Sequence, residues 1–459
     1  MGSEEMPSKK TRADLCEGPL WSSIFKFAFP VMLTGLLQSL YNAADTIIVG
    51  RFAGQEALAG VGTSAALTSL LLNLFLGLTS GVTVLLGNAL GAKDTKNIHK
   101  IVHTSMLLCI IGGIFISLVG ILFARPLLAM TGVPKDVMPQ ATLYMKIIFI
   151  GKLPMLIYNI GAAILRAKGD TKRPLYIVSV SGIVNVGLNL LFVVGFKMQA
   201  EGVAIATVIA QIINAVAILM ILCNSEDETR LCIKKLKIYK KQAADVLKIG
   251  IPAGIQSATF SFSNVIIQSG INGFGAAAIA GSAAATNITN FYDIIFNAMF
   301  TTPLVFVSHN MGAKKYDRIA KIVGVCLAYV CIFWVLLACL SYFGKNMLIG
   351  FYNPGNETAI AFGATVLLIN GTTFGLCGLM NVMGGTIRGM GHSFKSMIVT
   401  LGGVCGIRIL WIATVFKMFP HFWVLFISYP ISWLGTFLIH CLVFKYLIRK
   451  IKNGEEIKV

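Results

Sequence analysis

Long runs of apolar residues alternate with short polar connections along almost the whole chain of 459 residues. Each run has about 20 or more residues, the length that an α-helix needs to cross the hydrocarbon core of a bilayer. Because such runs recur from beginning to end, a soluble domain with a single membrane anchor is excluded. The pattern predicts twelve membrane-spanning helices, at residues 24–49, 57–87, 99–125, 138–165, 174–196, 202–223, 247–271, 278–307, 320–344, 358–386, 396–417 and 420–446.

The two halves of the chain are related in sequence. The longest polar connection, Ser225 to Lys248, contains seven Lys or Arg residues and separates six spans from six. An offset of 221 or 222 residues matches an ordered series of positions, which chance does not produce. We therefore predict two six-helix lobes related by a pseudo-twofold axis along the membrane normal, with the substrate path between them. The matches are Pro30 with Pro252, Asn42 with Asn264, Gly54 and Gly60 with Gly275 and Gly281, residues 91–93 with 312–314, residues 100–102 with 321–323, and Arg166 and Gly169 with Arg388 and Gly391.

These boundaries divide the chain into five parts. We expect an N-terminal tail at 1–23, an N-lobe at 24–224, a linker at 225–246, a C-lobe at 247–448 and a C-terminal tail at 449–459. The fold class is thus an all-α polytopic membrane protein. Two lobes in one chain form a complete path, so the protein is expected to work as a monomer.

The composition agrees, and the positions of the charges add an orientation. Hydrophobic residues make up 56% of the chain and charged residues only 12%, too few to cover a soluble protein of this length. Of the 38 Lys and Arg residues, 29 lie in the tails and the even-numbered connections, which predicts that both termini are cytoplasmic in a multi-pass cell-membrane protein. The net charge of +19 is therefore expected to contact lipid headgroups and not nucleic acid.

Several short motifs recur in order along the chain. They are Phe29-Pro30, Ala44-Asp45-Thr46, the segment 165–174 (LRAKGDTKRP) between spans 4 and 5, its counterpart 387–392 (IRGMGH), Asn185, and the segment 202–207 (GVAIAT). Together these motifs resemble the multidrug and toxic compound extrusion (MATE) family, in particular its bacterial DinF-like branch. The resemblance covers essentially the whole chain and implies an ion-driven exporter of lipophilic, often cationic, small organic molecules.

Asp45 is the most informative intramembrane residue, because a charge inside a bilayer is costly and calls for a function. It lies 15 residues after Pro30, about 22 Å along a helix, and shares one helix face with Gln38 and Tyr41. A carboxylate there can take up a proton or coordinate a bare cation. The resemblance implies a cation-coupling site at Asp45, Asn185, Asn189 and Thr207. Related sequences often have a second Asp at position 189, so H⁺ and Na⁺ both stay open as the coupling ion.

Three further charges do not follow from the resemblance. Lys152 could pair with Asp45 and Arg408 with Asp293, each within one lobe, and for Arg408 we favour this structural role. Asp293 could instead face the cleft, where it would attract a cationic substrate or serve as a second coupling carboxylate.

Spans 1 and 7 should face each other across the cleft. We expect the substrate to contact Gln38, Tyr41, Asn42, Gln256, Phe260, Asn264, Tyr292 and Asp293.

Other functions find less support in the sequence. No GxxxxGK[ST] pattern occurs, so ATP-driven transport is unsupported, and the basic connections at 166–174 and 312–315 are interpreted as turns. No catalytic or metal-binding cluster indicates an enzyme or a cofactor. A flippase for lipid-linked sugars remains the nearest alternative, with Lys152 and Arg408 as its cavity charges. A major facilitator is less favoured, because the connection at 91–96 lacks that superfamily's Asp-Arg-x-Gly-Arg-Arg signature.

Overall fold

The computed structural model describes residues 15–50, 73, 75, 77–130, 133 and 137–454, apart from the side chains of 261 and 262. Its first half consists of helices joined by short connections. They are α1 (Leu20–Ile48), the short helix Gly77–Gly91, α3 (Thr95–Met130), α4 (Met138–Ile150), α5 (Lys152–Ala167), α6 (Lys172–Asn189) with the π-helical turn η2 (Leu190–Gly195), and α7 (Ala200–Cys223).

The second half repeats this order after a 3₁₀ turn, η3 (Ile233–Lys235). Its helices are α8 (Lys240–Asn272), α9 (Ala276–Gly312), α10 (Tyr316–Tyr352), α11 (Glu357–Val366) with η4 (Leu367–Gly371), α12 (Gly375–Gly389), α13 (Ser393–Thr400), α14 (Ile407–Trp411) and α15 (Phe422–Lys452). Two further π-helical turns, η5 (Leu401–Gly406) and η6 (Ile412–Phe416), flank α14.

The predicted spans correspond to these helices wherever the structure describes them. Within the described ranges, nine helical segments are long and apolar enough to cross a bilayer, and Glu357–Gly371 with Gly375–Gly389, bent by 41°, can form a tenth. Most of the predicted span 57–87 lies outside the described residues, as do Gly54 and Gly60. The 33-residue helix α8 has a more polar sequence than the other long helices, because one of its faces lines the cleft described below.

Span 4 is broken, although the sequence pattern predicted one continuous helix at 138–165. Helix α4 ends at Ile150, and α5 begins two residues later at Lys152. The cause is Pro154, which has no N–H to donate to the carbonyl of Ile150 and whose ring clashes with that carbonyl. Met138–Ala167 still forms one span of 30 residues, as predicted, and Lys152 lies at the interruption near its middle.

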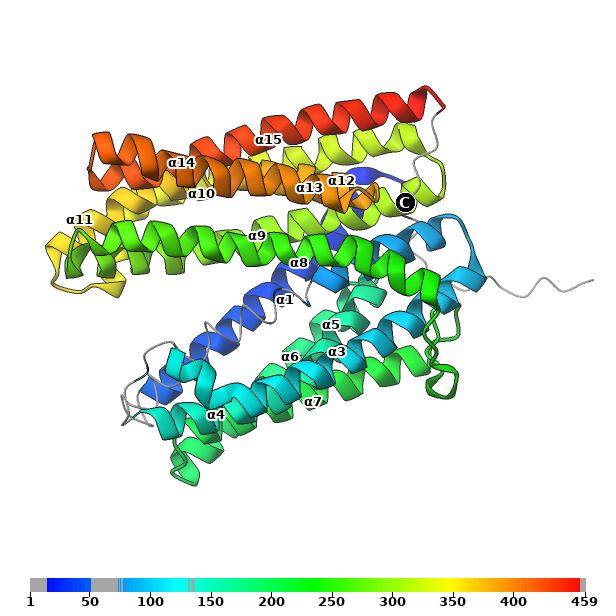
Figure 1. The fold of residues 1–459 in the computed structure, drawn as a ribbon, viewed down its shortest axis with the longest axis horizontal. Coiled ribbons are helices and arrows are strands. Elements are labelled where there is room, and N and C mark those ends of the chain that lie inside the picture. The colour runs from blue at the N-terminus through cyan, green and yellow to red at the C-terminus, as the bar shows by residue number, and fades with distance from the viewer. Residues whose placement is uncertain are drawn as a thin grey trace, which may run out of the picture.

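The two lobes are visible as two helix bundles that diverge from one end of the molecule (Figure 1). One bundle contains α3–α7 and the other α9–α15, and each has its own apolar core. The first helix of each lobe reaches into the other core: Ile24 and Phe27 of α1 pack in the C-lobe core, and Val246 and Ile249 of α8 in the N-lobe core. This exchange joins the lobes where they meet, which we call the closed end.

Two glycines allow the backbones to approach at the closed end. A Cβ added to Gly91 would collide with the carbonyl oxygen of His309, and one added to Gly312 would collide with the carbonyl oxygen of Asn88. Because 221 residues separate both Gly91 from Gly312 and Asn88 from His309, the two contacts are equivalent under the pseudo-twofold. Any larger residue at either glycine would push the lobes apart.

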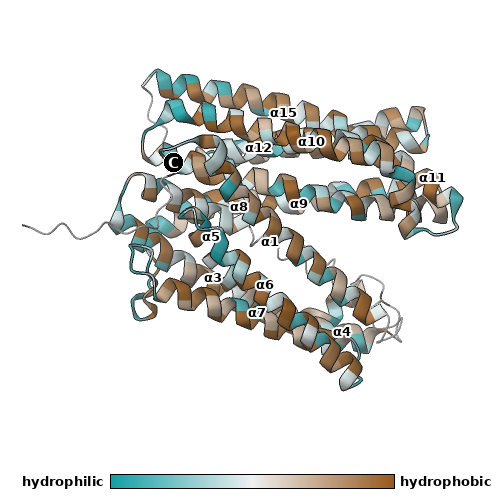
Figure 2. Ribbon diagram, turned by 180° about the vertical axis from the view of Figure 1, so that it is seen from behind, coloured by the Kyte–Doolittle hydropathy of each residue, from teal (hydrophilic) through white to brown (hydrophobic). Residues whose placement is uncertain are grey.

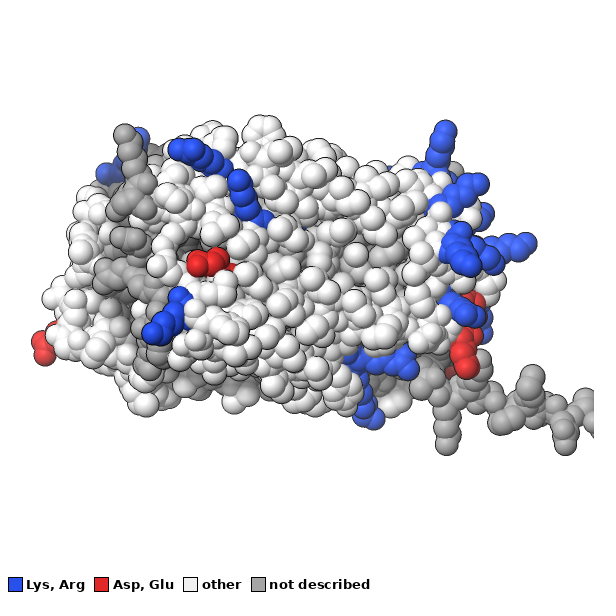
Figure 3. All heavy atoms as spheres, turned by 90° about the horizontal axis from the view of Figure 1, so that it is seen from below, with Lys and Arg blue, Asp and Glu red and all other residues white. Residues whose placement is uncertain are grey.

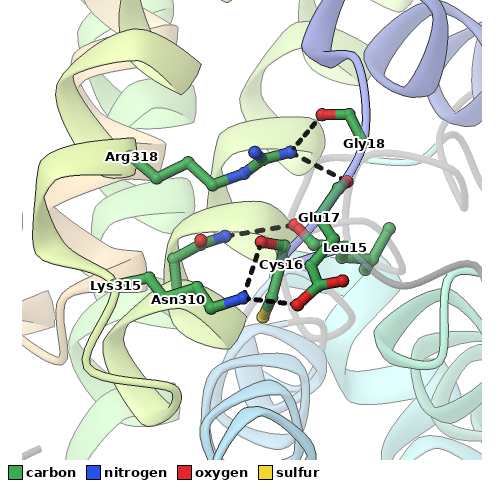
Figure 4. Close-up of polar contacts among 7 residues, drawn as sticks. All are labelled: Leu15, Cys16, Glu17, Gly18, Asn310, Lys315 and Arg318. Carbon is green, nitrogen blue, oxygen red and sulfur yellow. Dashed lines mark hydrogen bonds and ion pairs between the residues drawn. The ribbon is translucent and has the colours of Figure 1, made fainter.

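The N-terminal segment fastens α1 to the C-lobe at the same end (Figure 4). Arg318 Nη2 donates to the carbonyl oxygens of Glu17 and Gly18 at 2.9 and 2.7 Å, and Lys315 Nζ lies 2.9 Å from Glu17 Oε1. Asn310 Nδ2 donates to the carbonyl oxygen of Leu15 at 3.2 Å. We call residues 15–18 with Asn310, Lys315 and Arg318 the terminal clasp.

The linker makes an equivalent contact with the N-lobe. The backbone N–H of Cys232 donates to His103 Nε2 at 3.0 Å, and that of Tyr239 donates to Thr104 Oγ1 at 3.1 Å. Asp227 also pairs with Lys168. Burial raises the pKa of Asp227, but hydrogen bonds from Lys168 and Thr229 and the charge of Lys168 outweigh this and lower it. The linker is thus anchored to α3 before it enters α8.

The outer surface is that of a membrane protein. Hydrophobic residues run along the lengths of the helices in both bundles (Figure 2), and large apolar side chains such as Leu122, Phe343 and Phe351 are 72%, 83% and 86% exposed. Figure 3 shows a broad uncharged band with Lys and Arg side chains toward both ends of the molecule, the closed end included. Both described ends of the chain lie there, since Cys16 and Lys452 line one pocket.

Candidate functional site

The N-lobe brings Asp45 into contact with two of the residues predicted to accompany it. Asn189 Nδ2 donates to Asp45 Oδ1 at 2.5 Å, and Thr207 Oγ1 donates to Asp45 Oδ2 at 3.3 Å. Asn189 Nδ2 also donates to Asn185 Oδ1 at 3.2 Å. The residues come from α1, α6 and α7, and Asn189 is the last residue of α6 before η2. We call these four residues the acid cluster.

The acid cluster contains several side-chain oxygen atoms that accept few hydrogen bonds. Asn185 and Asn189 are 4% and 0% exposed, and Asn189 Oδ1 is buried without a hydrogen-bond partner in the described structure. Carboxylate, amide and hydroxyl oxygens are the ligands that hard cations prefer, and a carboxylate can alternatively bind a proton. Among the described residues, no group of three or more His, Cys, Asp or Glu is placed to hold a metal ion.

Close contact between α1 and α6 fixes the position of Asp45. The Tyr41 hydroxyl donates to the carbonyl oxygen of Val178 at 2.8 Å, one turn before Asp45 on α1. The Tyr41 ring lies against Gly182, where any Cβ would collide with it. Tyr41 therefore docks α1 onto α6 and is not among the residues that line the cleft, so its predicted contact with the substrate stays a prediction.

The two ion pairs proposed from the sequence do not form. Lys152 is buried at 7% exposure, yet no ion pair joins it to Asp45 among the described residues, nor does one join Asp293 to Arg408. The Asp45 carboxylate is held instead by neutral donors from Asn189 and Thr207. No permanent partner from this part of the chain neutralises it.

A cleft of about 960 Å³ lies between the lobes. Gln38, Asn42, Gln256, Phe260, Asn264 and Asp293 line it, as the sequence predicted. Tyr292 does not: its ring is 3% exposed and its hydroxyl lies 3.0 Å from Ser341 Oγ, within the C-lobe core. Adjacent residues on a helix point about 100° apart, so Asp293 faces the cleft while Tyr292 packs inward.

Three arginines line the cleft, and the sequence analysis assigned only Arg408 to the membrane. Arg166 and Arg388 had been placed in basic connections, but they belong to the last turns of α5 and α12 and point into the cleft. The sequence contained one signal for this placement, because Arg166 and Arg388 match each other under the 222-residue offset. That match relates both positions to the symmetry of the lobes, which a general excess of positive charge in loops would not do. Arg388 and Arg408 are 4% and 2% exposed.

Comparison with known proteins decides the family. A sequence profile of the MatE family matches residues 30–191 and again 252–414, so the two matched segments start 222 residues apart and cover most of the chain. The chain belongs to the MatE family. This finding confirms the resemblance and the internal repeat, and it excludes the major facilitator alternative.

Relatives of this MatE protein carry several names. A Bacillus subtilis protein with the name "Probable multidrug resistance protein YoeA" is 26% identical over 85% of this chain and 86% of its own length. A Shewanella oneidensis protein named as an FAD transporter is 21% identical over 85% of this chain and 87% of its own. An outward-facing multidrug resistance MATE transporter shares the fold, with a TM-score of 0.90 at 19% identity over 97% of this chain and 100% of that one.

Proposed function

We propose that this MatE protein is a secondary active exporter of small organic molecules, which it exchanges for H⁺ or Na⁺ by alternating access. The names of its relatives support export of organic compounds. The acid cluster carries the proposal of ion coupling, because Asp45 is held by neutral donors and keeps its charge available for an incoming cation. Cofactors have no part in this mechanism, and one chain supplies the whole pathway.

The orientation follows from the charges. Of the 38 Lys and Arg residues, 29 lie in the tails and the even-numbered connections, and the two described chain ends lie at the closed end, which the positive-inside rule therefore assigns to the cytoplasm. The cleft then opens to the outside, and membrane lipids surround the uncharged band. A cation from outside would bind at the acid cluster and favour the conformation that has released its substrate.

Alternating access requires the closed end to open. The contacts that would separate are those between lobes: the Gly91 and Gly312 crossings, the terminal clasp and the packing of Phe27 on Phe306, whose ring centroids lie 5.6 Å apart. Substrate binding from the cytoplasm would have to offset the loss of these contacts. The lobes can therefore rock as units around the cleft.

The replacement Asp45→Asn tests the proposal. We expect it to abolish gradient-driven transport of ethidium, riboflavin and flavin mononucleotide (FMN) in everted vesicles, while the protein still reaches the membrane, because an amide cannot exchange a proton or neutralise a cation. Applying Na⁺ and H⁺ gradients separately identifies the ion. Asp317→Asn, an exposed carboxylate at the closed end, is the control and should leave transport unchanged. Wild-type transport by Asp45→Asn would overturn the assignment.

A flippase for lipid-linked sugars is a second candidate, and the three arginines in the cleft favour it more than the sequence did. Such a protein would move a lipid phosphate or pyrophosphate across the bilayer. Reconstitution with a fluorescent short-chain polyprenyl pyrophosphate separates the two: a flippase equilibrates it between leaflets, and an exporter of soluble molecules leaves it in place.

A further inference from the structure

Arg388 and Arg408 are buried charges that the proposed ion coupling does not use. Taking a guanidinium out of water costs several kcal/mol unless a partner compensates. Proteins normally supply that partner as a carboxylate, yet no ion pair to either arginine occurs in the described residues. Both side chains line the cleft, where a ligand can reach them.

The contacts of Arg388 are all with neutral groups. Its Nη2 donates to Gln256 Oε1 at 2.7 Å and its Nη1 to Ser80 Oγ at 3.4 Å, while Nε is buried without a partner in the described structure. The guanidinium carbon lies 5.0 Å from the centre of the Phe300 ring. An arginine has five N–H donors, so most of the hydrogen-bonding capacity of Arg388 is unused.

Arg408 is positioned for an aromatic ligand as well as for an anion. Its Nε donates to Ser432 Oγ at 3.1 Å and its Nη1 to Asn264 Oδ1 at 3.4 Å. The guanidinium lies 4.0 Å from the centre of the Tyr429 ring and 5.8 Å from that of Trp433, and both rings line the cleft. These contacts hold the guanidinium plane in place, and its Nη2 has no acceptor in the part of the chain described.

The spacing and the charge balance indicate what could bind. Gln256 and Asn264 are eight residues apart on α8, so the two arginines that contact them are separated by about 12 Å along the cleft. Among the described lining residues, Arg166, Arg388 and Arg408 face a single acid, Asp293. The cleft is therefore net positive, opposite to what a binding site for lipophilic cations needs.

We propose that the C-lobe side of the cleft binds organic anions: Arg408 binds a phosphate or carboxylate of the substrate, and Tyr429 and Trp433 beside it contact the substrate's aromatic ring. Arg388, about 12 Å away along the cleft, adds to its positive charge. A guanidinium binds either group through two parallel hydrogen bonds. The aromatic residues beside Arg408 favour a flat, soluble molecule over a lipid headgroup. This inference rests on the proposed export function and narrows its substrate class from lipophilic cations to aromatic anions.

Binding of FMN and of riboflavin to the purified protein tests the inference, because the two molecules share one ring system and differ by a phosphate. We expect the wild type to bind FMN at least tenfold more tightly, since a hydrogen bond to a charged group contributes about 1.5–3 kcal/mol. Fluorescence titration in detergent needs no ion gradient. Failure of ion coupling and failure of anion binding are therefore separate results.

Variants locate the site. Arg408→Gln should weaken FMN binding about tenfold or more and leave riboflavin binding unchanged. Arg388→Gln should weaken FMN binding only about twofold, because Arg388 acts on the phosphate through its charge from about 12 Å away. Arg408→Lys should be intermediate, because it keeps the charge and loses the planar fork. Lys417→Gln, an exposed charge nine residues after Arg408 and outside the cleft lining, is the control.

Equal binding of FMN and riboflavin by the wild type, or no binding of either, would overturn the proposal, and this comparison does not depend on whether a variant folds. Equal losses for FMN and riboflavin in the arginine variants would also overturn it, because they would indicate a structural role. Displacement of FMN by a polyprenyl phosphate, but not by the parent alcohol, would assign the site to a lipid headgroup instead.

Discussion

The acid cluster of the N-lobe and the arginines of the C-lobe place charges of opposite sign in two lobes that share one fold. In the N-lobe, neutral donors from Asn189 and Thr207 surround the Asp45 carboxylate. In the C-lobe, neutral acceptors such as Gln256 and Ser432 surround the guanidinium groups of Arg388 and Arg408. No described residue of opposite charge forms an ion pair with Asp45, Arg388 or Arg408. Each therefore keeps a charge of one sign available to something that arrives from outside the protein.

This difference suggests that the two lobes bind different ligands. A duplicated fold gives each half the same helix order, but the side chains that face inward have diverged. Asn264 matches Asn42 under the repeat, whereas the second-half position that matches Asp45 is Ile267, a buried apolar residue. A cation bound in one lobe and an anion in the other need no shared contact, because the lobes move together and the coupling is thermodynamic.

The strongest way to sharpen the comparison is to add charge to the acid cluster. Asn189→Asp would place a second carboxylate beside Asp45, and two carboxylates bind a cation more tightly than one. We expect the half-saturating concentration of the coupling cation to fall at least about tenfold in vesicle transport. Asn189→Ala, which only removes an amide, should raise it. An unchanged cation dependence in both variants would mean that the cation binds elsewhere.

Asp293 gives a smaller test, directed at the C-lobe. It is an exposed carboxylate in the cleft, and from the sequence it could attract a cationic substrate, serve as a second coupling carboxylate or pair with Arg408. If the cleft binds anions, Asp293→Asn removes a like charge and should tighten FMN binding about twofold, the effect of one charge about 10 Å away in water. Fluorescence titration measures it, with Asp317→Asn as the control. Weaker FMN binding, or a selective loss of ethidium export, would favour attraction of a cationic substrate instead.

The sequence was sufficient for the fold because the bilayer imposes strong rules on span length and charge. Twelve spans, two lobes and the relation between them could be predicted from apolar runs and from matches such as Pro30 with Pro252. The predicted neighbours of Asp45 also come together, since family motifs fix them one by one. The break before Lys152 was missed, although Pro154 is a local signal for it.

The chemistry of the cleft was harder to predict because it depends on which way each side chain points. Arg166 and Arg388 lie one turn before a glycine turn, where a loop and the end of a helix look alike in sequence. Tyr292 and Asp293 are neighbours in sequence but point in different directions. The proposed pairs of Lys152 with Asp45 and of Arg408 with Asp293 failed for a related reason: membership of one lobe does not bring two long side chains within bonding distance.

The smallest expected effect concerns the terminal clasp, which holds both sites open to the same side. Arg318→Gln removes the two hydrogen bonds to the carbonyl oxygens of Glu17 and Gly18. Exposed contacts of this kind contribute about 1 kcal/mol or less, so we expect the population open at the cytoplasmic end to rise about twofold to threefold. Spin labels at Lys96 and Lys395, exposed residues of different lobes, can measure it in a cysteine-free background. Lys321→Gln, in the same pocket but without a described bond to the N-terminal segment, should have no effect. A change of the same size in Lys321→Gln would mean that net charge at this end, and not the clasp, sets how long the acid cluster and the arginines face outward together.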